Sequence, residues 1–436
     1  MNTRQVKWIG GGAMLALVGG AAWLGMQHNA ALAQAAPAAP APPAVPAVST
    51  VAGMPPVIDA RNLYSEVAAG KISPALASDL VRIYVPNLRS GDVYVVDPAA
   101  MKVVDRFKVG IGPQHIVPAW DLRTLWVTNN AEGRTDGSLT PIDPLTGKPG
   151  KPVMVDDPYN MYFTPDGKSA IVVAEARKRL DFRDPKTMAP QYSIDVPGCP
   201  GVNHADFSID GRFAVFTCEF SGTLAKIDLA ERKVLGYLKL TMPATRFKEV
   251  PGAPRTPPGK VWEPGESELC TVTKGMPQDI RSSPDGKRFY IADMHADGVH
   301  IVDSASFKQV GFIQTGLGAH GLYPSRDGKQ LYVANRGSHK IHGSRLGNGG
   351  VAVIDFATEK VVARWAVPGG GSPDMGNVSA DGKYLWLAAR YDDVIYRFDT
   401  TANGAVEQIK VGAEPHGLTV WPQPGRFSLG HTGNLR

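Results

Sequence analysis

Residues 316–337, GLGAHGLYPSRDGKQLYVANRG, predict two short β-strands joined by a tight turn. The Asp-Gly pair at 327–328 favours a turn that connects two antiparallel strands. The same pattern returns as PDGKSAIVVAE, IDGRFAVFTCE, PDGKRFYIADM and ADGKYLWLAAR. The chain therefore consists of a repeated antiparallel β-unit, and His320 stands where the first strand of one unit begins.

Two motifs count the units independently. In the first, a short apolar strand ends in an Asp that can accept backbone N–H groups of the following turn. Its members are Asp97, Asp143, Asp184, Asp228, Asp303, Asp355 and Asp399. In the second, a Gly- or Pro-containing approach precedes a polar residue and an apolar strand. Its members are His115, Asn160, His204, Asp279, His320, Asp374 and His416. Each motif occurs seven times.

The spacing of these motifs predicts the fold. Successive members of the second motif are 45, 44, 75, 41, 54 and 42 residues apart, which places insertions near 241–273 and 339–350. Four strands in a period of a little over 40 residues are typical of a β-propeller blade. The 48 Gly and 36 Pro of the 436 residues suit many short strands and tight turns.

The two ends of the repeat region complement each other. The first unit, starting at VRIYVPN, lacks an innermost strand, and the last unit has only that strand, PHGLTVWP. Pairing the two would remove two exposed sheet edges. We therefore expect an all-β, monomeric, seven-bladed β-propeller over residues 79–425. Its four-stranded antiparallel blades should close by pairing of the C-terminal innermost strand with the N-terminal outer strands.

The segments outside the propeller predict export. A basic MNTRQVKW, an apolar IGGGAMLALVGGAAWLGM and a small-residue ALAQA indicate a Sec-type signal peptide over residues 1–35 and a periplasmic or secreted protein. An uncleaved anchor is the alternative, because residues 8–26 approach the length of a short membrane span. Residues 36–78 should form an Ala/Pro-rich tether and lead-in. The tail, 426–436, is expected to lie across one face without an element of its own, with His431 as an additional candidate ligand.

Charge and cysteine content limit the possible partners. A formal net charge of +5, without a run of five Lys or Arg, argues against nucleic-acid binding. The three cysteines, Cys199, Cys218 and Cys270, predict one disulfide and one thiol in an oxidising compartment, and the spacing leaves the pairing open.

The polar ring predicts a site at one mouth of the central channel. Innermost strands run along the channel, so their seven polar residues should face a common axis. The same rim should hold Glu175 and Glu219 from the neighbouring connections. Imidazoles, carboxylates and a thiol in one place suit a soft or borderline transition metal. The candidate metal ligands are His115, His204, His320, His416, Asp279, Asp293 and Cys218.

The polar ring could also bind other ligands, or it could bind only water. The rim would also suit an anionic organic ligand or a noncovalent haem-type or quinone cofactor, with Arg336, Arg390, Asn160 and Asp374 as binding residues. Alternatively, the polar residues only contact water in a wet channel. Covalent haem is excluded because no Cys-x-x-Cys-His motif occurs, and a nucleophile elbow, a phosphate loop and a zinc-protease helix motif are also missing.

The strand sequences LYVAN at 331–335, FYIAD, LWVTN and IYVPN resemble the YVTN-type repeat family of seven-bladed propellers over about residues 80–425. More distantly, the pattern resembles the haem-binding propeller of cytochrome nitrite reductases and the propellers of quinoprotein amine dehydrogenases. The resemblance implies the fold, whereas members of such a family differ in what they bind.

Three functions follow as hypotheses. The first is a binding or accessory protein that holds a metal ion or small ligand at the channel mouth. The second is an enzyme, either an oxidoreductase with a noncovalent cofactor or a metal-dependent lyase or lactonase. The third is an interaction scaffold that docks another periplasmic protein through the insertion at 241–273. The insertion at 339–350, with His339 and His342, is expected to be a solvated loop.

Overall fold

The computed structural model describes residues 47–243, 274–431 and 433–436. Within them, the only helices are two short 3-10 turns, η1 (Ser65–Val67) and η2 (Pro74–Leu76), and the remaining elements are strands. None of the helices in these ranges has the length and apolar character needed to cross a membrane. The expected signal peptide, Cys270 and most of the 241–273 insertion lie outside the described residues.

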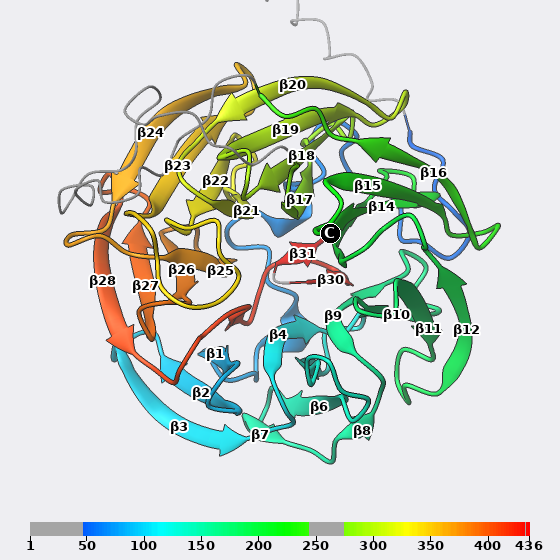
Figure 1. Cartoon of the computed structure of the whole chain (residues 1–436). Helices are drawn as coiled ribbons and strands as arrows, with labels where there is room; N and C mark the ends of the chain where they lie inside the picture. Colours follow the sequence, from blue (N-terminus) through cyan, green and yellow to red (C-terminus); the bar gives the residue numbers. More distant parts are fainter. Residues whose placement is uncertain (1–46, 244–273, 432) are drawn as a thin grey trace, which may run out of the picture. The chain divides into compact units, whose positions relative to one another are not determined.

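The strands form seven antiparallel blades arranged in a ring (Figure 1). The innermost strands are β29 (Thr419–Trp421), β4 (Pro113–Pro118), β9 (Pro158–Phe163), β13 (Val202–Phe207), β17 (Pro277–Ser282), β21 (Ala319–Pro324) and β25 (Pro373–Val378). The second strands are β1 (Arg82–Asn87), β5 (Leu125–Asn129), β10 (Ala170–Ala174), β14 (Phe213–Cys218), β18 (Arg288–Asp293), β22 (Gln330–Asn335) and β26 (Tyr384–Ala389).

The outer half of each blade follows the same order. The third strands are β2 (Asp92–Asp97), β6 (Ser138–Asp143), β11 (Arg179–Arg183), β15 (Thr223–Asp228), β19 (Gly298–Asp303), β23 (Gly350–Asp355) and β27 (Val394–Asp399). The outermost strands are β3 (Lys102–Lys108), β7 (Lys148–Pro149) with β8 (Val153–Met154), β12 (Pro190–Asp195), β16 (Lys233–Lys239), β20 (Lys308–Gln314), β24 (Lys360–Ala366) and β28 (Ala405–Lys410).

Burial changes from the ring centre outward. Innermost strands such as β4 and β9 are buried at every residue, whereas outer strands such as β3 and β16 alternate between exposed and half-buried side chains. The apolar side chains of the inner strands pack between neighbouring blades. This pattern explains why the inner strands read as continuous apolar runs, because both of their faces are covered.

The repeated Asp residues cap turns, as predicted. Asp97 Oδ1 accepts the backbone N–H groups of Ala99 and Ala100 at 2.9 and 3.0 Å. The equivalent carboxylates of the other six units also accept a backbone N–H two or three residues further along. The motif therefore marks the turn from the third to the fourth strand of each blade.

The ring closes as the sequence predicts. β29 pairs antiparallel with β1, with Ile83 opposite Val420, so one blade combines a C-terminal innermost strand with three N-terminal strands. The pairing confirms the predicted all-β, seven-bladed fold and its mode of closure. It links the two ends of the propeller by backbone hydrogen bonds and leaves neither strand as an open edge.

The C-terminal tail corrects one expectation, because it forms two strands of its own. β30 (Ser428–Gly430) pairs with β9, and β31 (Asn434–Leu435) pairs with β30. In Figure 1 both strands (red) lie inside the ring. Gly430 has a φ of +100°, and a Cβ there would lie 2.4 Å from the Cα of Tyr162, so this crossing requires glycine.

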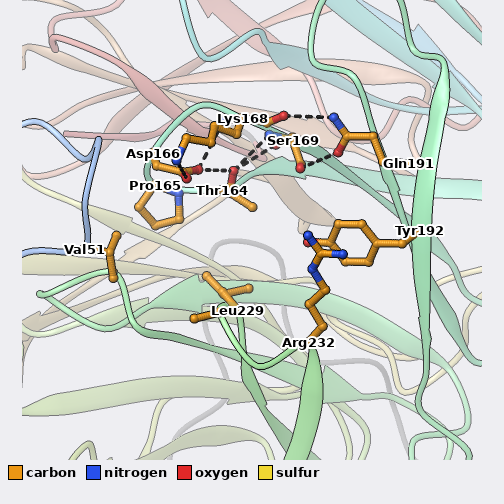
Figure 2. Close-up of a pocket in the computed structure, with 12 residues that line it drawn as sticks. Val51, Thr164, Pro165, Asp166, Lys168, Ser169, Gln191, Tyr192, Leu229 and Arg232 are labelled. Carbon is orange, nitrogen blue, oxygen red and sulfur yellow. Dashed lines mark hydrogen bonds and ion pairs between the residues drawn. The ribbon is translucent and has the colours of Figure 1, made fainter.

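Two grooves lie between neighbouring blades. One groove of about 640 Å³ is lined by Asp166 and Lys168 of an Asp-Gly turn and by Tyr192 and Arg232 (Figure 2). A second groove of about 490 Å³ is lined by Asp285 and other residues of the equivalent turn in another blade. Because the same repeat element lines both, the grooves follow from the architecture, and neither is lined by a histidine or a cysteine.

Candidate metal centre

Six of the seven polar residues of the ring lie at β-bulges. In β13 the register with β14 shifts between Val202 and Ala205, on either side of His204, and in β4 it shifts between Pro113 and His115. Comparable shifts accompany Asn160, Asp279, His320 and Asp374. A bulge turns a side chain away from the ordinary alternation of a strand. All seven polar residues of the ring are buried.

Five histidines converge at the centre of the channel. The ring centroid of His115 lies 4.8 Å from that of His416, 5.4 Å from that of His204 and 5.2 Å from that of His431. His320 completes the group, with its centroid 5.6 Å from that of His416. We call these five residues the histidine cluster. The structure thus brings together all four histidines predicted as metal ligands.

Three members of the cluster have the spacing of a metal site. One side-chain nitrogen from each of His115, His204 and His431 lies within 4.8 Å of the others, and all three residues are buried. His431 comes from the tail, and its backbone N–H donates to the carbonyl oxygen of Met161 at 3.1 Å. The pairing of β30 with β9 therefore carries a fifth imidazole into the ring.

On one side of the cluster, which we call the open side, imidazole nitrogens lack partners. Both ring nitrogens of His115 and Nε2 of His204 are buried without a hydrogen-bond partner. Asn160 Nδ2 lies 3.1 Å from His204 Nδ1 and 3.2 Å from His431 Nδ1. Because Asn160 Oδ1 accepts the N–H of Met161, Nδ2 is the donor, and it points at a lone pair on each imidazole.

On the other side, which we call the braced side, a single carboxylate holds two histidines. Asp374 Oδ1 lies 2.8 Å from His320 Nδ1, and its Oδ2 lies 2.9 Å from His416 Nδ1. Arg336 Nη2 donates to both oxygens at 2.9 Å. Carboxylates that bind Nδ1 orient the Nε2 lone pair of metal-ligating histidines in the same way. His416 Nε2 is buried without a hydrogen-bond partner.

Electrostatics keeps the cluster neutral. Burial is the leading cause that lowers the imidazole pKa values, to about 4 for His416, to about 3 for His320 and well below the ordinary value for the other three. Burial alone would raise the pKa of Asp374, but the Arg336 guanidinium and the two braced imidazoles hold it well below its usual range. Neutral imidazoles next to a fixed carboxylate are the state in which histidine binds a metal.

The closing strand leaves no room beside His115. A Cβ on Gly417 would lie 2.1 Å from His115 Nδ1. Gly417 N–H donates to the carbonyl oxygen of Gln114 at 2.9 Å, and its own carbonyl oxygen accepts the N–H of Ile116 at 3.0 Å. The absence of a side chain therefore lets β4 and the segment carrying His416 approach each other.

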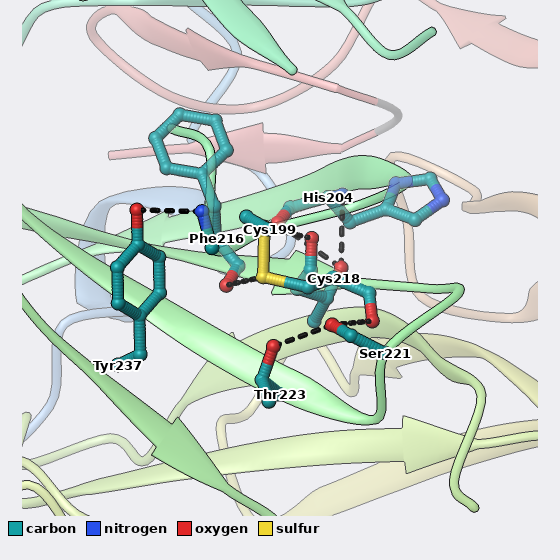
Figure 3. The surroundings of a disulfide bond; sticks show 9 residues. Cys199, His204, Phe216, Cys218, Ser221, Thr223 and Tyr237 are labelled. Carbon is teal, nitrogen blue, oxygen red and sulfur yellow. Dashed lines mark hydrogen bonds between the residues drawn. A yellow bond between two sulfur atoms is a disulfide. The ribbon is translucent and has the colours of Figure 1, made fainter. Parts of the chain in front are cut away.

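Cys218 is not available as a thiolate ligand. Its sulfur is bonded to that of Cys199, and Figure 3 shows the ring of His204 pointing away from this disulfide. The structure thus supplies the predicted disulfide, decides its pairing and corrects the expectation that Cys218 would serve as a metal ligand. The reason is topological, since the chain entering β13 passes beside the end of β14 and brings the two cysteines together.

The two predicted aspartate ligands have other partners. Asp293 Oδ1 accepts the N–H groups of Met276, His295 and Ala296, and its Oδ2 lies 3.3 Å from His300 Nε2, so the structure does not bring it to the cluster. Asp279 Oδ1 lies 2.8 Å from Arg281 Nη1 and 3.4 Å from His431 Nε2. Asp279 therefore stands behind the tail histidine.

The rim residues predicted from the strand connections line one small cavity. Glu175, Glu219, Arg336 and Arg390 surround it together with Tyr159 and His320, and its volume is about 30 Å³. We call this cavity the vestibule. Because His320 belongs to both the vestibule and the histidine cluster, the vestibule is the approach to the cluster from this rim.

Comparisons with known proteins agree with the architecture. A YNCE-like beta-propeller family model matches residues 267–424. The search of curated proteins found no match.

Several solved structures share the fold. A putative 6-phosphogluconolactonase of Bacteroides fragilis has a TM-score of 0.57 and 17% identity, covering 79% of this chain and 99% of that chain. The periplasmic gluconolactonase PpgL of Pseudomonas aeruginosa has a TM-score of 0.55 and 19% identity, with coverage of 77% and 98%. The dihydro-heme d1 dehydrogenase NirN, in complex with DHE, has a TM-score of 0.51 and 14% identity, with coverage of 78% and 75%. At these identities the likeness concerns the fold alone. The predicted resemblance is confirmed at that level: the chain forms a seven-bladed β-propeller that is similar to YNCE-like propellers over residues 267–424.

Proposed function

We propose that this protein binds one transition-metal ion at the histidine cluster and acts as a binding or accessory protein. The observation that carries the proposal is the buried group of His115, His204 and His431, whose nitrogens lie within 4.8 Å of one another. Ligand atoms around a tetrahedral ion lie about 3.3 Å apart, so the rings would move inward by about 1 Å. His320 and His416 offer two further ligands on the braced side.

The donor set selects the class of metal. Imidazole nitrogens suit zinc, copper, cobalt and nickel, whereas calcium and magnesium require oxygen ligands. The orphaned nitrogens of His115 and His416 support this choice, because buried polar atoms without partners are rare unless something binds them. Asp374 would orient its two histidines toward the ion, as outer carboxylates do in metal sites.

Metal analysis tests the proposal. Protein prepared without chelator, and protein reloaded with Co²⁺ after chelation, should each hold about one equivalent of metal per chain. Replacing both His204 and His431 by Ala should abolish this binding. The control is His295→Asn, which changes a histidine outside the cluster. A wild-type protein that retains no transition metal before or after reloading, while folded by circular dichroism, would refute the proposal.

The enzyme alternatives require more space than the vestibule offers. PpgL is named as a periplasmic gluconolactonase, and this likeness favours a test for lactone hydrolysis. A sugar lactone or a tetrapyrrole is far larger than a cavity of about 30 Å³, which holds on the order of one or two water molecules. Turnover of gluconolactone by the metal-loaded protein, lost in the His204→Ala, His431→Ala variant, would decide for the lactonase.

Export and partner docking are separate proposals. The N-terminal signal motif supports a periplasmic or secreted location, and N-terminal sequencing of protein from the periplasmic fraction tests cleavage near Ala35. A product that retains residues 1–35 and sediments with membranes would favour the anchor. The 241–273 insertion is proposed as the docking element for another periplasmic protein, and its deletion should abolish capture while the propeller stays folded.

A further inference from the structure

The vestibule contains more polar groups than its own hydrogen bonds satisfy. Five of its lining residues each have a buried side-chain atom without a hydrogen-bond partner. These atoms are Gln114 Oε1, Asn130 Oδ1, Glu175 Oε1, Arg336 Nε and Arg390 Nε. A buried donor or acceptor without a hydrogen bond costs folding free energy. A water-sized polar ligand that hydrogen-bonds to several of these atoms removes that cost. Both donors and acceptors are present, so the ligand must be able to donate and accept.

Two carboxyl groups in the vestibule face each other. The side chains of Glu175 and Glu219 lie within hydrogen-bond reach of one another, so one of them must carry a proton for the contact to be attractive. Glu219 Oε2 also accepts a hydrogen bond from Asn203 Nδ2 at 2.7 Å. Burial raises the pKa of both carboxyl groups, which agrees with a shared proton at neutral pH.

The vestibule adjoins the histidine cluster directly. Tyr159 lines it, and the Tyr159 ring centroid lies 5.4 Å from that of His115 and 6.0 Å from that of His204. His320 lines it on the braced side. Tyr159 and His320 therefore connect the vestibule with the histidine cluster.

We propose that Glu175 and Glu219 form a proton-exchanging carboxyl pair that serves a water-sized ligand of the metal through the vestibule. This role rests on the proposed metal site. A metal held by the cluster would make a water molecule in the vestibule more acidic. The pair would take up the proton released when the water O–H bond breaks, a new O–H bond would form on a carboxylate oxygen of the pair, and the pair would then hold two protons. The reverse step returns the proton, and neither step needs an oxidant or a reductant.

Other charged and titratable groups face the pair and belong to the same equilibrium. They are Glu132, Asp157, Tyr159, Arg336, Arg390 and His342. Asp157 and Glu132 add to the negative potential at Glu175, whereas Arg336 acts in the opposite sense on Glu219. The conservative variants Glu175→Gln and Glu219→Gln therefore test the pair without changing the size of its side chains.

The first experiment is infrared spectroscopy of metal-free protein at neutral pH. The carbonyl band of a protonated carboxyl group, shifted by exchange into D₂O, should be present in the wild type and lost or moved in Glu175→Gln and Glu219→Gln. The control is Glu231→Gln, at an exposed glutamate in the turn between β15 and β16 that does not line the vestibule. Absence of the band in folded wild-type protein would refute the protonated carboxyl pair, independently of whether the protein binds a metal.

The second experiment follows the visible spectrum of the Co²⁺-loaded protein as a function of pH. Deprotonation of a water ligand changes this spectrum. A carboxylate nearby disfavours the negatively charged hydroxide, so its loss in Glu219→Gln should lower the apparent pKa of the change by about one pH unit, a tenfold effect. Glu175→Gln should act in the same direction, and Glu231→Gln should have no effect. Unchanged titrations in both vestibule variants would overturn this inference alone, whereas failure to bind Co²⁺ would overturn the proposed metal site and this role with it.

Discussion

The open and braced sides of the histidine cluster are held in different ways. On the braced side, Asp374 contacts His320 and His416, and Arg336 neutralises it with two hydrogen bonds of 2.9 Å. On the open side, both nitrogens of His115 lack a partner, and Asn160 points at the other two imidazoles. The braced side is held by charge-assisted contacts, although His416 Nε2 and Arg336 Nε are orphaned there as well, and each orphaned polar atom costs the protein about 1–3 kcal/mol. His115 has no such anchor, and the proposed metal would contribute its binding energy mainly on the open side.

Acidification should break both sides together, and it is the largest effect we expect. Burial holds the imidazole pKa values of all five histidines below the value of about 6.5 in an unfolded chain. As the pH falls through about 6.5 the unfolded chain therefore takes up protons first. Each imidazole then removes up to about 1.4 kcal/mol of folding free energy per pH unit, until the pH reaches its pKa in the fold.

Glu175 and Glu219 oppose this trend, because their raised pKa values favour the fold as the pH falls, but one pair acts against five imidazoles. Denaturant unfolding of metal-free protein at several pH values between about 5 and 8 measures the slope. A free energy of unfolding that stays flat over that range would show that the cluster is already protonated or exposed.

Among single substitutions, removal of the Asp374 carboxylate should reduce the free energy of unfolding most. Asp374→Ala leaves the buried Arg336 guanidinium without its carboxylate and should cost about 3–5 kcal/mol. His115→Ala removes an imidazole with no hydrogen bond and should cost much less of the free energy of unfolding. Chemical denaturation of both metal-free variants makes the comparison. Equal losses would mean that the two sides do not differ.

Substitution on the open side should matter most for metal affinity. His431→Ala removes one ligand and should weaken Co²⁺ binding by about 100-fold or more, while the tail keeps its backbone pairing with β9. Because the ring is fully buried and contacts Asn160 and Asp279, the metal-free variant should also lose part of its free energy of unfolding, which denaturation measures separately. Competition titration with a chelating dye measures the affinity. Unaltered affinity would move the site to the braced side.

A smaller effect should follow from crowding His115. Gly417→Ala places a Cβ against the ring and should reduce Co²⁺ affinity by about tenfold, because the imidazole must tilt away. The matched control is Gly236→Ala in β16, where an added Cβ meets nothing within 4 Å. Equal affinities in the two variants would show that the orientation of His115 is irrelevant to binding.

The inter-blade groove should give no effect on metal binding. Asp166→Asn and Lys168→Ala alter the groove of about 640 Å³ between two blades, away from the histidine cluster. We expect unchanged Co²⁺ affinity and a change in the free energy of unfolding within about 0.5 kcal/mol, as for ordinary surface substitutions. A clear loss of Co²⁺ affinity would show that the groove is part of the metal site.

Most of the site could be predicted because its residues recur with the repeat. His115, His204, His320 and His416 occupy equivalent positions of equivalent strands, so counting the motif predicted that they face one axis. Asp293 and Cys218 failed as ligands for a local reason. Asp293 caps the backbone of its own loop, and Cys218 bonds to Cys199, which lies on the chain entering the preceding strand of the same blade.

The sequence by itself determined the number of blades, their strand order, the closure by β29 and the polar ring, because short-range periodicity and turn chemistry repeat within each unit. Only the tertiary structure decided that His431 joins the cluster, since the tail reaches β9 through contacts between residues 268 or more positions apart, such as Gly430 and Tyr162. It also decided that Asp374 and Arg336 form a brace. Such pairings depend on how strands from different blades converge at one axis, and no local pattern encodes that convergence.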